Sequence, residues 1–336
     1  MVAQAMLMEG LVVPLLGAGI NLCGRPANQP FRPGEFLPNG AELASVLAKK
    51  VRRGYPPWIL EDLLRVSQCV DHNRGWKVLY TTLHQLFDAN YPPTAFHRFL
   101  ARVPKLIGQM EHPPMDRYQL IVTTNYDDVL EQAFNDADEP FDLLWYVARG
   151  ENLGRFMHRR PDGTTEPILD PEHYEAIPLS LERTVILKIH GAVDRPSGAA
   201  DSYVITEDNY IDYLTRIEIR KLIPKALLAK LRQSSILFVG YSMRDWNLRA
   251  IFHRIWQEEK LGYKSWAIRK PLGDLPEDKR DDPAEIKRHR QRRLEDGLEE
   301  AFWDDRGVEI FDADLAAYCQ ALDQVANEFV GTSAGS

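Results

Sequence analysis

Two side chains suited to hydrogen-bonding and acid–base chemistry, Asn125 and His190, each stand shortly after an apolar segment of the chain. A carboxamide both donates and accepts hydrogen bonds, so Asn125 can hold a water molecule or a sugar hydroxyl. A neutral imidazole accepts a proton near pH 7. Taken alone, His190 fits a structural role in the core better than a catalytic one. Together, the two residues indicate chemistry on a substrate that carries hydroxyl groups.

A glycine-containing segment, 17–21 (Gly-Ala-Gly-Ile-Asn), follows the apolar run 11–16. Gly17 and Gly19 remove side chains where the chain must turn and where a ligand must approach the backbone closely. The amino end of a following helix would suit a phosphate. The segment is also compatible with a plain tight turn, because Leu22 interrupts the full G-x-G-x-x-G pattern.

Two further polar positions follow apolar runs. Gly240 and Ser242 come after the run 235–239, and they would contact a phosphate or a ribose. The alternative there is a strand-to-helix turn with Ser242 or Asp245 as its cap. Asp127 likewise suits either the site or a helix N-cap. Ligands of open α/β sheets bind beyond the carboxyl ends of the strands, so we expect these segments to meet in one crevice.

The elements that must position these residues alternate between strands and helices, which predicts an α/β fold. We expect a Rossmann-like, doubly wound and mostly parallel sheet with an inserted helical subdomain. The strands predicted in the second half of the chain are 184–189, 235–239, 265–268 and 308–310. The predicted helices are 41–51, 59–70, 76–87, 94–101, 207–233, 245–258, 284–303 and 313–329.

The chain is predicted to form a single domain over residues 1–330. Within it, residues 41–103 form a helical insertion or cap, and 135–182 form a loop-rich insertion with a turn at 161–163. Residues 22–40, rich in Pro, Gly and Asn, are expected to cover the ligand site. The tail 331–336 is expected to be disordered.

Composition restricts the location and the partners. The chain has 336 residues, a formal net charge of −8 and 3 cysteines. There is no apolar run long enough for a membrane span and no signal-peptide pattern, so we expect a cytoplasmic protein without membrane contact. The acidic balance argues against direct nucleic-acid binding. The one basic run, 287–293, is flanked by acidic residues and is typical of a solvated helix rather than a nucleic-acid contact.

Four motifs in a fixed order resemble those of the sirtuin family, which carries Gly-Ala-Gly-Ile-Ser, Thr-Gln-Asn-Ile-Asp, His-Gly and Gly-Thr-Ser. The matching segments here are 17–21, 123–127 (Thr-Thr-Asn-Tyr-Asp), 190–191 and 240–242 (Gly-Tyr-Ser). The resemblance spans about residues 10–325. The variant second and fourth motifs resemble a bacterial sirtuin-like branch in anti-phage defence systems, which cleaves NAD rather than deacylating proteins.

The resemblance implies that the protein is an NAD⁺ hydrolase with NAD as its substrate. It also implies a role in defence, in which phage infection triggers the enzyme and the enzyme depletes cellular NAD. It implies catalytic roles for Asn125 and His190, and adenine contacts at Phe311. The residues that it implies for NAD binding are Gly17, Ala18, Gly19, Asn21, Thr124, Asp127, Gly240, Ser242 and Phe311.

Two departures from the family pattern weaken a deacylase function. Deacylases carry two Cys-x-x-Cys pairs that bind zinc, whereas Cys23, Cys69 and Cys319 are widely spaced, so we expect no zinc. Asn21 replaces the usual serine. The alternatives are an NAD-dependent protein deacylase and a non-catalytic assembly subunit that binds NAD or ADP-ribose. Relatives of this size imply a homo-oligomer and a separately encoded partner, either a HerA-type hexameric ATPase or a short Argonaute.

Overall fold

The fold is described from a computed structural model of the chain. The described residues are those of 1–336 other than 27–28, 52–54, 115–116, 178–181, 197, 216–220, 244–245, 257–260, 276–279 and 334–336. Asp245, a candidate helix cap, and the end of the predicted tail therefore lie outside them.

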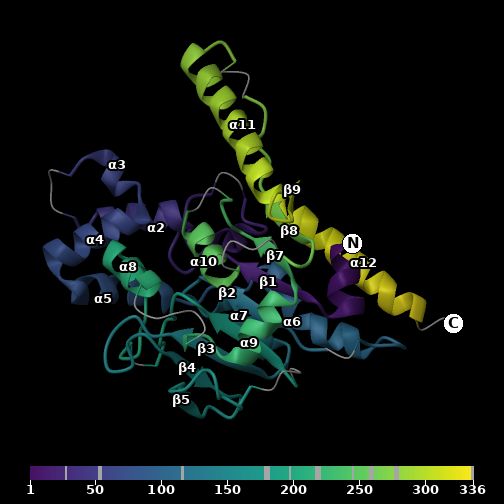
Figure 1. The fold of residues 1–336 in the computed structure, drawn as a ribbon. Helices are drawn as coiled ribbons and strands as arrows, with labels where there is room; N and C mark the ends of the chain where they lie inside the picture. The colour runs from purple at the N-terminus through teal and green to yellow at the C-terminus, as the bar shows by residue number, and fades with distance from the viewer. Residues whose placement is uncertain are drawn as a thin grey trace.

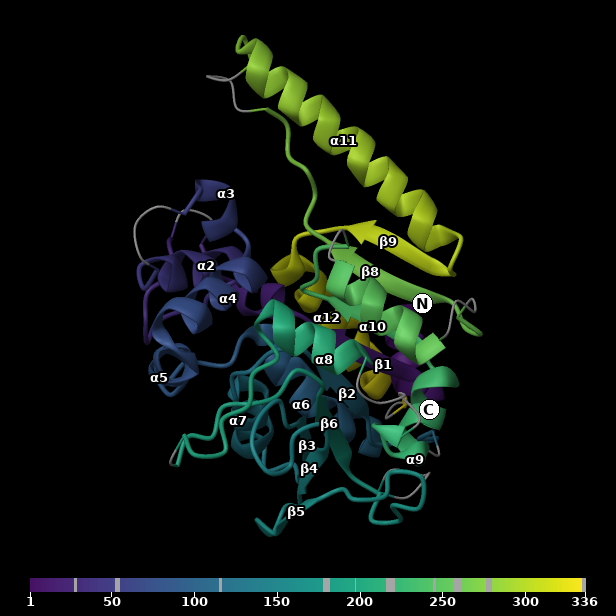
Figure 2. The same ribbon diagram turned by 60° about the vertical axis from the view of Figure 1, so that its left-hand side comes forward.

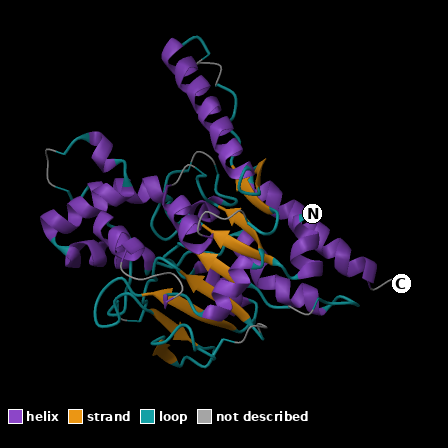
Figure 3. Cartoon of the chain, in the orientation of Figure 1, coloured by secondary structure: helices purple, strands orange, loops and turns teal. Residues whose placement is uncertain are grey.

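A central sheet of nine strands, counted over the described residues, runs through the molecule in the order β5-β4-β3-β6-β2-β1-β7-β8-β9 (Figures 1 and 3). All neighbouring pairs from β3 to β9 are parallel, whereas β4 and β5 form an antiparallel extension at one edge. The strands are β1 (Val12–Leu16), β2 (Leu120–Thr123), β3 (Phe141–Tyr146), β4 (Phe156–Arg159), β5 (Thr165–Pro167), β6 (Thr184–Lys188), β7 (Ser235–Val239), β8 (Ser265–Arg269) and β9 (Val308–Asp312). This arrangement confirms the predicted α/β, Rossmann-like fold class.

The strand order reverses at β1. The chain passes from β1 to β2 on one side, and later strands β7, β8 and β9 extend the sheet on the other side. In register, Leu16 lies opposite Thr123 of β2 and Val239 of β7, so the three strands end at the same level. Ligands of doubly wound folds bind at such a switch point.

Helices cover both faces of the sheet. Along β1, Val13 and Leu15 belong to one core, while Val12 and Leu16 belong to the other, as expected for a strand buried on both faces. The core of Val13 includes residues of α8 (Glu207–Thr215), α9 (Lys225–Arg232), α10 (Trp246–Trp256) and the end of α11 (Pro283–Asp304). The other includes residues of α1 (Val2–Gln4), η1 (Ala5–Glu9), α6 (Ala95–Gly108), α7 (Val129–Asp136) and α12 (Leu315–Ser333).

A helical subdomain lies beside the sheet and its covering helices, next to α8 (Figure 2). It consists of α2 (Gly40–Ala48), α3 (Pro57–Leu60), α4 (Leu63–Arg74) and α5 (Trp76–Phe87). These helices share a third apolar core, in which Leu47, Val66 and Leu83 are fully buried, and to which Tyr203 also belongs. The helix predicted at 94–101 lies within α6, which packs on the sheet rather than with these four helices.

Several predicted boundaries differ from the structure. The segment 135–182 contains the predicted hairpin as β4 and β5, but it also contributes β3, a parallel strand that the sequence did not predict. The helix predicted at 59–70 breaks before α4, where the Asp62 side chain accepts a hydrogen bond from the Arg65 amide as an N-cap. In the region 207–233, where helices were predicted, the structure has α8 and then α9, whose N-cap is Pro224.

At the carboxyl end, α12 continues to Ser333, beyond the point where the disordered tail was predicted to begin. No described helix combines the length and the apolar character needed to cross a membrane.

Candidate active site

A cavity of about 1270 Å³ lies at the carboxyl ends of the central strands. It is larger than the ~300–1,000 Å³ of common small-molecule sites. Its walls come from the strand ends, the loop before α2, the amino ends of α2 and α4, and the inner face of α11. Among the lining residues are Leu22, Arg25, Glu42, Asp62, Thr124, Asn125, His190, Tyr210, Tyr241, Arg269, Arg292, Asp296 and Glu299.

The floor of the cavity is formed by two glycine-containing loops packed backbone to backbone. The Gly19 amide donates to the Gly240 carbonyl at 2.8 Å, and the Gly17 amide donates to the Val239 carbonyl at 2.9 Å. Gly240 has a φ of +76°, and a Cβ there would lie 2.3 Å from the Ile20 nitrogen. Only glycine therefore permits this contact at position 240. The segment after Gly17 forms a short 3₁₀ helix, η2 (Ala18–Leu22).

Asn125 is fixed at the end of β2 by contacts on both its backbone and its side chain. Its backbone amide donates a hydrogen bond to the Thr123 hydroxyl at 3.0 Å. Its carboxamide nitrogen lies 3.4 Å from the Gly17 carbonyl oxygen. The neighbouring Thr124 hydroxyl lies 3.0 Å from the Tyr241 hydroxyl. The ends of β1, β2 and β7 are therefore joined directly by side chains from the cavity wall.

Asp127 follows Asn125 and is buried. One carboxylate oxygen accepts a hydrogen bond from the Val129 amide at 3.2 Å, and the other lies 3.5 Å from the Asn21 carboxamide nitrogen. The N-cap position of α7 itself belongs to Asp128, one residue later than the alternative interpretation of Asp127 assumed. Burial raises the pKa of Asp127 to about 6, and the nearby Lys188 partly opposes the rise.

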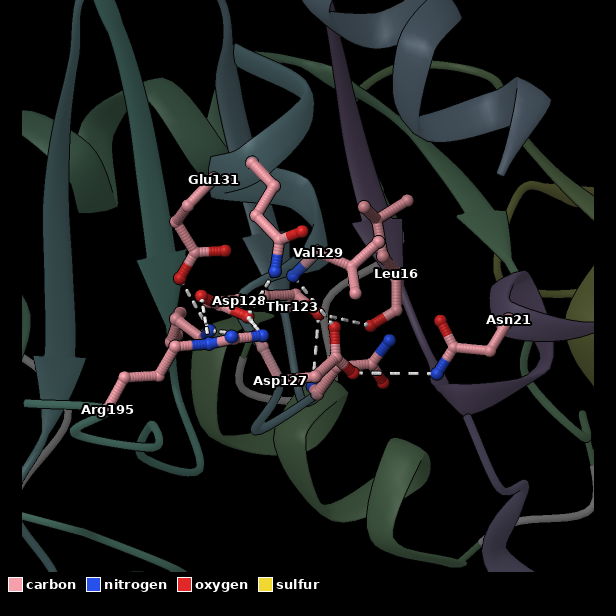
Figure 4. Close-up of polar contacts among 11 residues, drawn as sticks. Leu16, Asn21, Thr123, Asp127, Asp128, Val129, Glu131 and Arg195 are labelled. Atoms are coloured by element: carbon pink, nitrogen blue, oxygen red, sulfur yellow. Dashed lines mark hydrogen bonds and ion pairs between the residues drawn. The ribbon is translucent and has the colours of Figure 1, made fainter. Parts of the chain in front are cut away.

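Two ion pairs hold the loop of Asn125 and Asp127 in place (Figure 4). Lys188, fully buried on β6, pairs with Glu131 of α7 at 2.7 Å and donates to the backbone carbonyl of Asp127. On the other side, Arg195 pairs with Asp128 at 2.6 Å. Breaking the buried pair of Lys188 and Glu131 would leave an uncompensated charge, so this pair fixes the loop most firmly, while the partly exposed pair of Arg195 and Asp128 adds a weaker contact.

His190 lies at the end of β6, lines the cavity and is only 3% exposed. Its Nδ1 is 3.1 Å from the Tyr210 hydroxyl, while its Nε2 has no hydrogen-bond partner among the described residues. Burial lowers the pKa of His190 to about 3, so the ring is neutral at physiological pH. Gly191 has a φ of +95°, and a Cβ there would collide with the Ser202 carbonyl at 2.1 Å. A buried, unpartnered ring nitrogen at a cavity wall is suited to a ligand hydroxyl or a water.

The structure brings most of the predicted site residues to this one cavity. Those in its lining are Ala18, Gly19, Asn21, Thr124, Asn125, Asp127, His190, Gly240 and Ser242. Gly17 lies outside the lining and contributes its backbone carbonyl to Asn125. Phe311 also lies outside it, and its partly buried ring packs against the core beneath α12.

Several residues at the cavity were not anticipated from the sequence. The Arg25 side chain, 5% exposed, pairs with Glu42 at 2.5 Å. Glu42 also forms a capping box with Asn39, which fastens the loop before α2 to that helix. The spacing Asn39-x-x-Glu42 is a recognisable signal for this cap. No sequence signal pointed to Tyr210 or Tyr241, because their partners are remote in the chain.

Over the described part of the chain, no three His, Cys, Asp or Glu side chains come together as metal ligands would. Cys23 and Cys319 are buried, Cys69 is partly exposed, and none of them forms a disulfide.

Comparison with known proteins gives one family. A family profile described as a SIR2-like domain matches residues 119–309, which is more than half of the chain and includes β2, β6, β7 and the strand ends at Asn125, His190 and Gly240. No curated protein matches the chain significantly.

Proposed function

The chain belongs to the SIR2-like family, whose members are generally NAD-dependent enzymes, and on this premise we propose that it is an NAD⁺ hydrolase. It would cleave the bond between nicotinamide and ribose to give nicotinamide and ADP-ribose. We propose further that the cleavage serves anti-phage defence by depleting NAD. Because NAD loss harms the cell, the activity would be held off until an oligomer or a partner protein triggers it.

The observation that supports this proposal most directly is the state of His190. Its ring is buried at the cavity wall and neutral, and Nε2 is without a partner among the described residues. If Nδ1 carries the proton and donates it to the Tyr210 oxygen, Nε2 presents a lone pair. That lone pair would accept a hydrogen bond from the attacking water or from a ribose hydroxyl.

Asn125 complements His190 in this proposal. Its carboxamide is held by Gly17, and it would orient the water and the ribose of the nicotinamide half.

In the proposed reaction, the bond from the ribose C1′ to the pyridinium nitrogen breaks, and its electron pair neutralises nicotinamide. A water oxygen bonds to C1′, and its proton passes to Nε2 of His190 and then to solvent. Nicotinamide leaves as a neutral molecule, so positioning and electrostatics carry the catalysis.

The remaining contacts follow from the loops around this centre. The backbone of Gly19 and Gly240, the side chains of Thr124 and Ser242, and the pair of Asn21 and Asp127 would hold the phosphates and riboses. The buried Asp127 is half protonated near its pKa of about 6, so it can serve as donor or acceptor to a ribose hydroxyl. Gly17, Ala18 and Phe311 complete the residues that we propose for NAD binding. Phe311 would support the adenine end of NAD.

The test is NAD consumption by the purified protein, alone and with an acetyl-lysine peptide. We expect NAD loss without peptide, and a loss of activity of about 10²–10⁴-fold in His190→Ala and Asn125→Ala. His173→Ala is the matched control, because its side chain is 76% exposed and remote from the cavity lining.

The other outcomes each identify another function. NAD loss that requires the peptide would mean a deacylase. Binding of NAD without turnover, at high protein concentration and with a HerA-type hexameric ATPase or a short Argonaute added, would mean a binding subunit. Either result would overturn the hydrolase proposal.

A further inference from the structure

Helix α11 stands away from the rest of the molecule, as both views show (Figures 1 and 2). It has 22 residues, and Trp303 near its carboxyl end is its one buried residue. At 1.5 Å per residue the helix is about 33 Å long. Contacts such as those of His289 with the Gly273 carbonyl and of Glu299 with Arg249 are polar, whereas helices in water owe most of their stability to packing of an apolar face.

The two faces of α11 differ in what they contact. Arg292, Asp296 and Glu299 lie on the face that lines the cavity. On the opposite face, Leu294 is 71% exposed and Leu298 is 72% exposed. Two leucines one turn apart, both open to water, form the apolar centre of a stripe on the outer face whose ends are polar.

The stripe has the spacing of a coiled-coil seam. Its positions are Lys287, Gln291, Leu294, Leu298, Ala301 and, just past the helix end, Asp305. These are separated alternately by four and three residues, the repeat that keeps one face of a helix against another helix. All six are exposed.

The charges along α11 are divided between its halves. The first half is mainly basic, with Lys287, Arg288, Arg290, Arg292 and Arg293 against Glu285. The second half is acidic, with Glu295, Asp296, Glu299, Glu300 and Asp304. A helix of this pattern is complementary to a second copy of itself that runs in the opposite direction.

We propose that α11 pairs with α11 of a second copy of this chain, antiparallel and about a two-fold axis between Leu294 and Leu298. In this pairing, Leu294 of each copy packs beside Leu298 of the other, and Gln291 lies beside Ala301. Lys287 lies beside Asp305, and Arg290 lies near Asp304. The leucines thus meet at the centre of the seam and opposite charges meet at its two ends.

Two features disfavour other occupants of this face. A parallel pairing would set the basic halves together and the acidic halves together, which is repulsive. A nucleic acid would meet the acidic half of the helix and the two leucines, neither of which suits phosphate. The ion pairs already present along the helix, such as Arg288 with Glu285, are compatible with the antiparallel pairing.

The test is the mass of the full-length protein by sedimentation over a range of concentrations, and it requires no enzymatic activity. We expect a monomer–dimer equilibrium for the unchanged chain. Leu294→Glu with Leu298→Glu should weaken dimerisation by about 100-fold or more, because it places charges at the centre of the seam. Leu169→Glu is the control, since Leu169 is 68% exposed and lies outside α11. Circular dichroism shows whether each variant remains folded.

A charge exchange tests the orientation. Lys287→Glu with Arg290→Glu makes both ends of the seam acidic, and Asp304→Lys with Asp305→Lys makes both ends basic. Each variant alone should be monomeric, and an equimolar mixture should form a dimer. A monomer at all concentrations for the unchanged chain, or dimers that none of these changes weakens, would overturn the proposal.

Discussion

The chemistry proposed for the site depends on which ring nitrogen of His190 carries the proton, and the hydrogen bond to Tyr210 bears on that choice. Their nitrogen and oxygen are 3.1 Å apart. If the hydroxyl donates to Nδ1, then Nε2 carries a proton and cannot act as a base. If Nδ1 donates, Nε2 is an acceptor. Tyr210 therefore acts on the reaction through the tautomer of His190.

We expect Tyr210→Phe to lower kcat by about 10-fold and to leave the KM for NAD nearly unchanged. The ring of Tyr210 packs edge-on against His190 with centroids 5.1 Å apart, and phenylalanine preserves that packing. The measurement combines steady-state kinetics with ¹⁵N NMR of the His190 ring. An unchanged tautomer ratio together with unchanged kcat would contradict this positioning role. Tyr174→Phe, which removes a hydroxyl near another buried histidine, His158, serves as control.

The sequence could indicate which candidate residues would lie near one another, because most of them stand next to a strand end, and most of them line the one cavity. The contacts that tune them could not. Tyr241 reaches Thr124, and Lys188 reaches Glu131, across 117 and 57 positions of the chain. A sequence pattern reports residues that are close along the chain, whereas pKa values and orientation depend on neighbours brought in by folding.

At the scale of elements, the strand ends depend on the close packing of the two glycine loops. Gly240→Ala would place a Cβ 2.3 Å from the Ile20 nitrogen, in a backbone conformation that L-residues avoid. We expect it to lower the free energy of unfolding by about 3 kcal/mol or more, through strain and displacement of η2.

Gly24→Ala is the matched comparison for this change. Gly24 has a similar φ of +78°, but no atom lies within 4 Å of its added Cβ. Its cost should be limited to backbone strain, about 1 kcal/mol. Urea denaturation of both variants measures the difference. Equal losses would show that the contact between the loops contributes nothing to stability.

The strand β3 shows why one element of the sheet escaped prediction. Asp142 is the second residue of β3, and a buried carboxylate is untypical of a strand inside a sheet. It is compensated by His158 at 2.8 Å and by Arg183 at 2.6 Å. Both partners come from later segments, so the local pattern of 135–182 resembled a loop. The strands β1, β2 and β7 carry no buried charge, and β6 carries one only at its last residue, Lys188, so their apolar runs predicted all four strands.

At the scale of the whole molecule, buried histidines make stability depend on pH. Burial lowers the pKa of both His97 and His190 to about 3, against an ordinary value of 6.5. The unfolded chain therefore binds more protons between pH 6.5 and 3, and stability falls as the pH falls through that range. Each histidine should cost about 2 kcal/mol at pH 5 relative to pH 7.5. Asp127 acts in the opposite direction, because its raised pKa of about 6 favours the folded state at low pH, by about 1 kcal/mol at pH 5.

The variant His97→Gln isolates one of these contributions. His97 and the N-cap residue Thr94 form the capping box of α6, in which each side chain bonds to the other residue's backbone amide. His97 lies outside the cavity lining, so the change leaves the site residues in place. We expect the difference in unfolding free energy between pH 7.5 and pH 5 to shrink by about 2 kcal/mol. Chemical denaturation at the two pH values measures it. A difference equal to that of the unchanged chain would mean that His97 titrates normally in the folded state.

The position of α11 links assembly to the site. Its inner face supplies Arg292, Asp296 and Glu299 to the cavity, while its outer face would bind the second copy. In the dimer, α11 would be packed on both faces, which would hold this wall of the cavity in place. In the monomer, α11 is packed on one face only and is freer to move. Because the wall is separate from His190 and Asn125, the pairing should affect NAD binding more than the chemical step.

We therefore expect Leu294→Glu with Leu298→Glu to raise the KM for NAD by about 5-fold and to leave kcat within a factor of about 2. For the unchanged chain, KM should rise in the same way when the protein is diluted below its dimer dissociation constant, and Leu169→Glu should follow the unchanged chain. Initial rates at several protein concentrations, compared with the sedimentation data, give both constants. A fall in kcat at constant KM would place the effect of assembly at the chemical step instead. A KM that does not vary with dimerisation would mean that α11 holds its side of the cavity without the second copy.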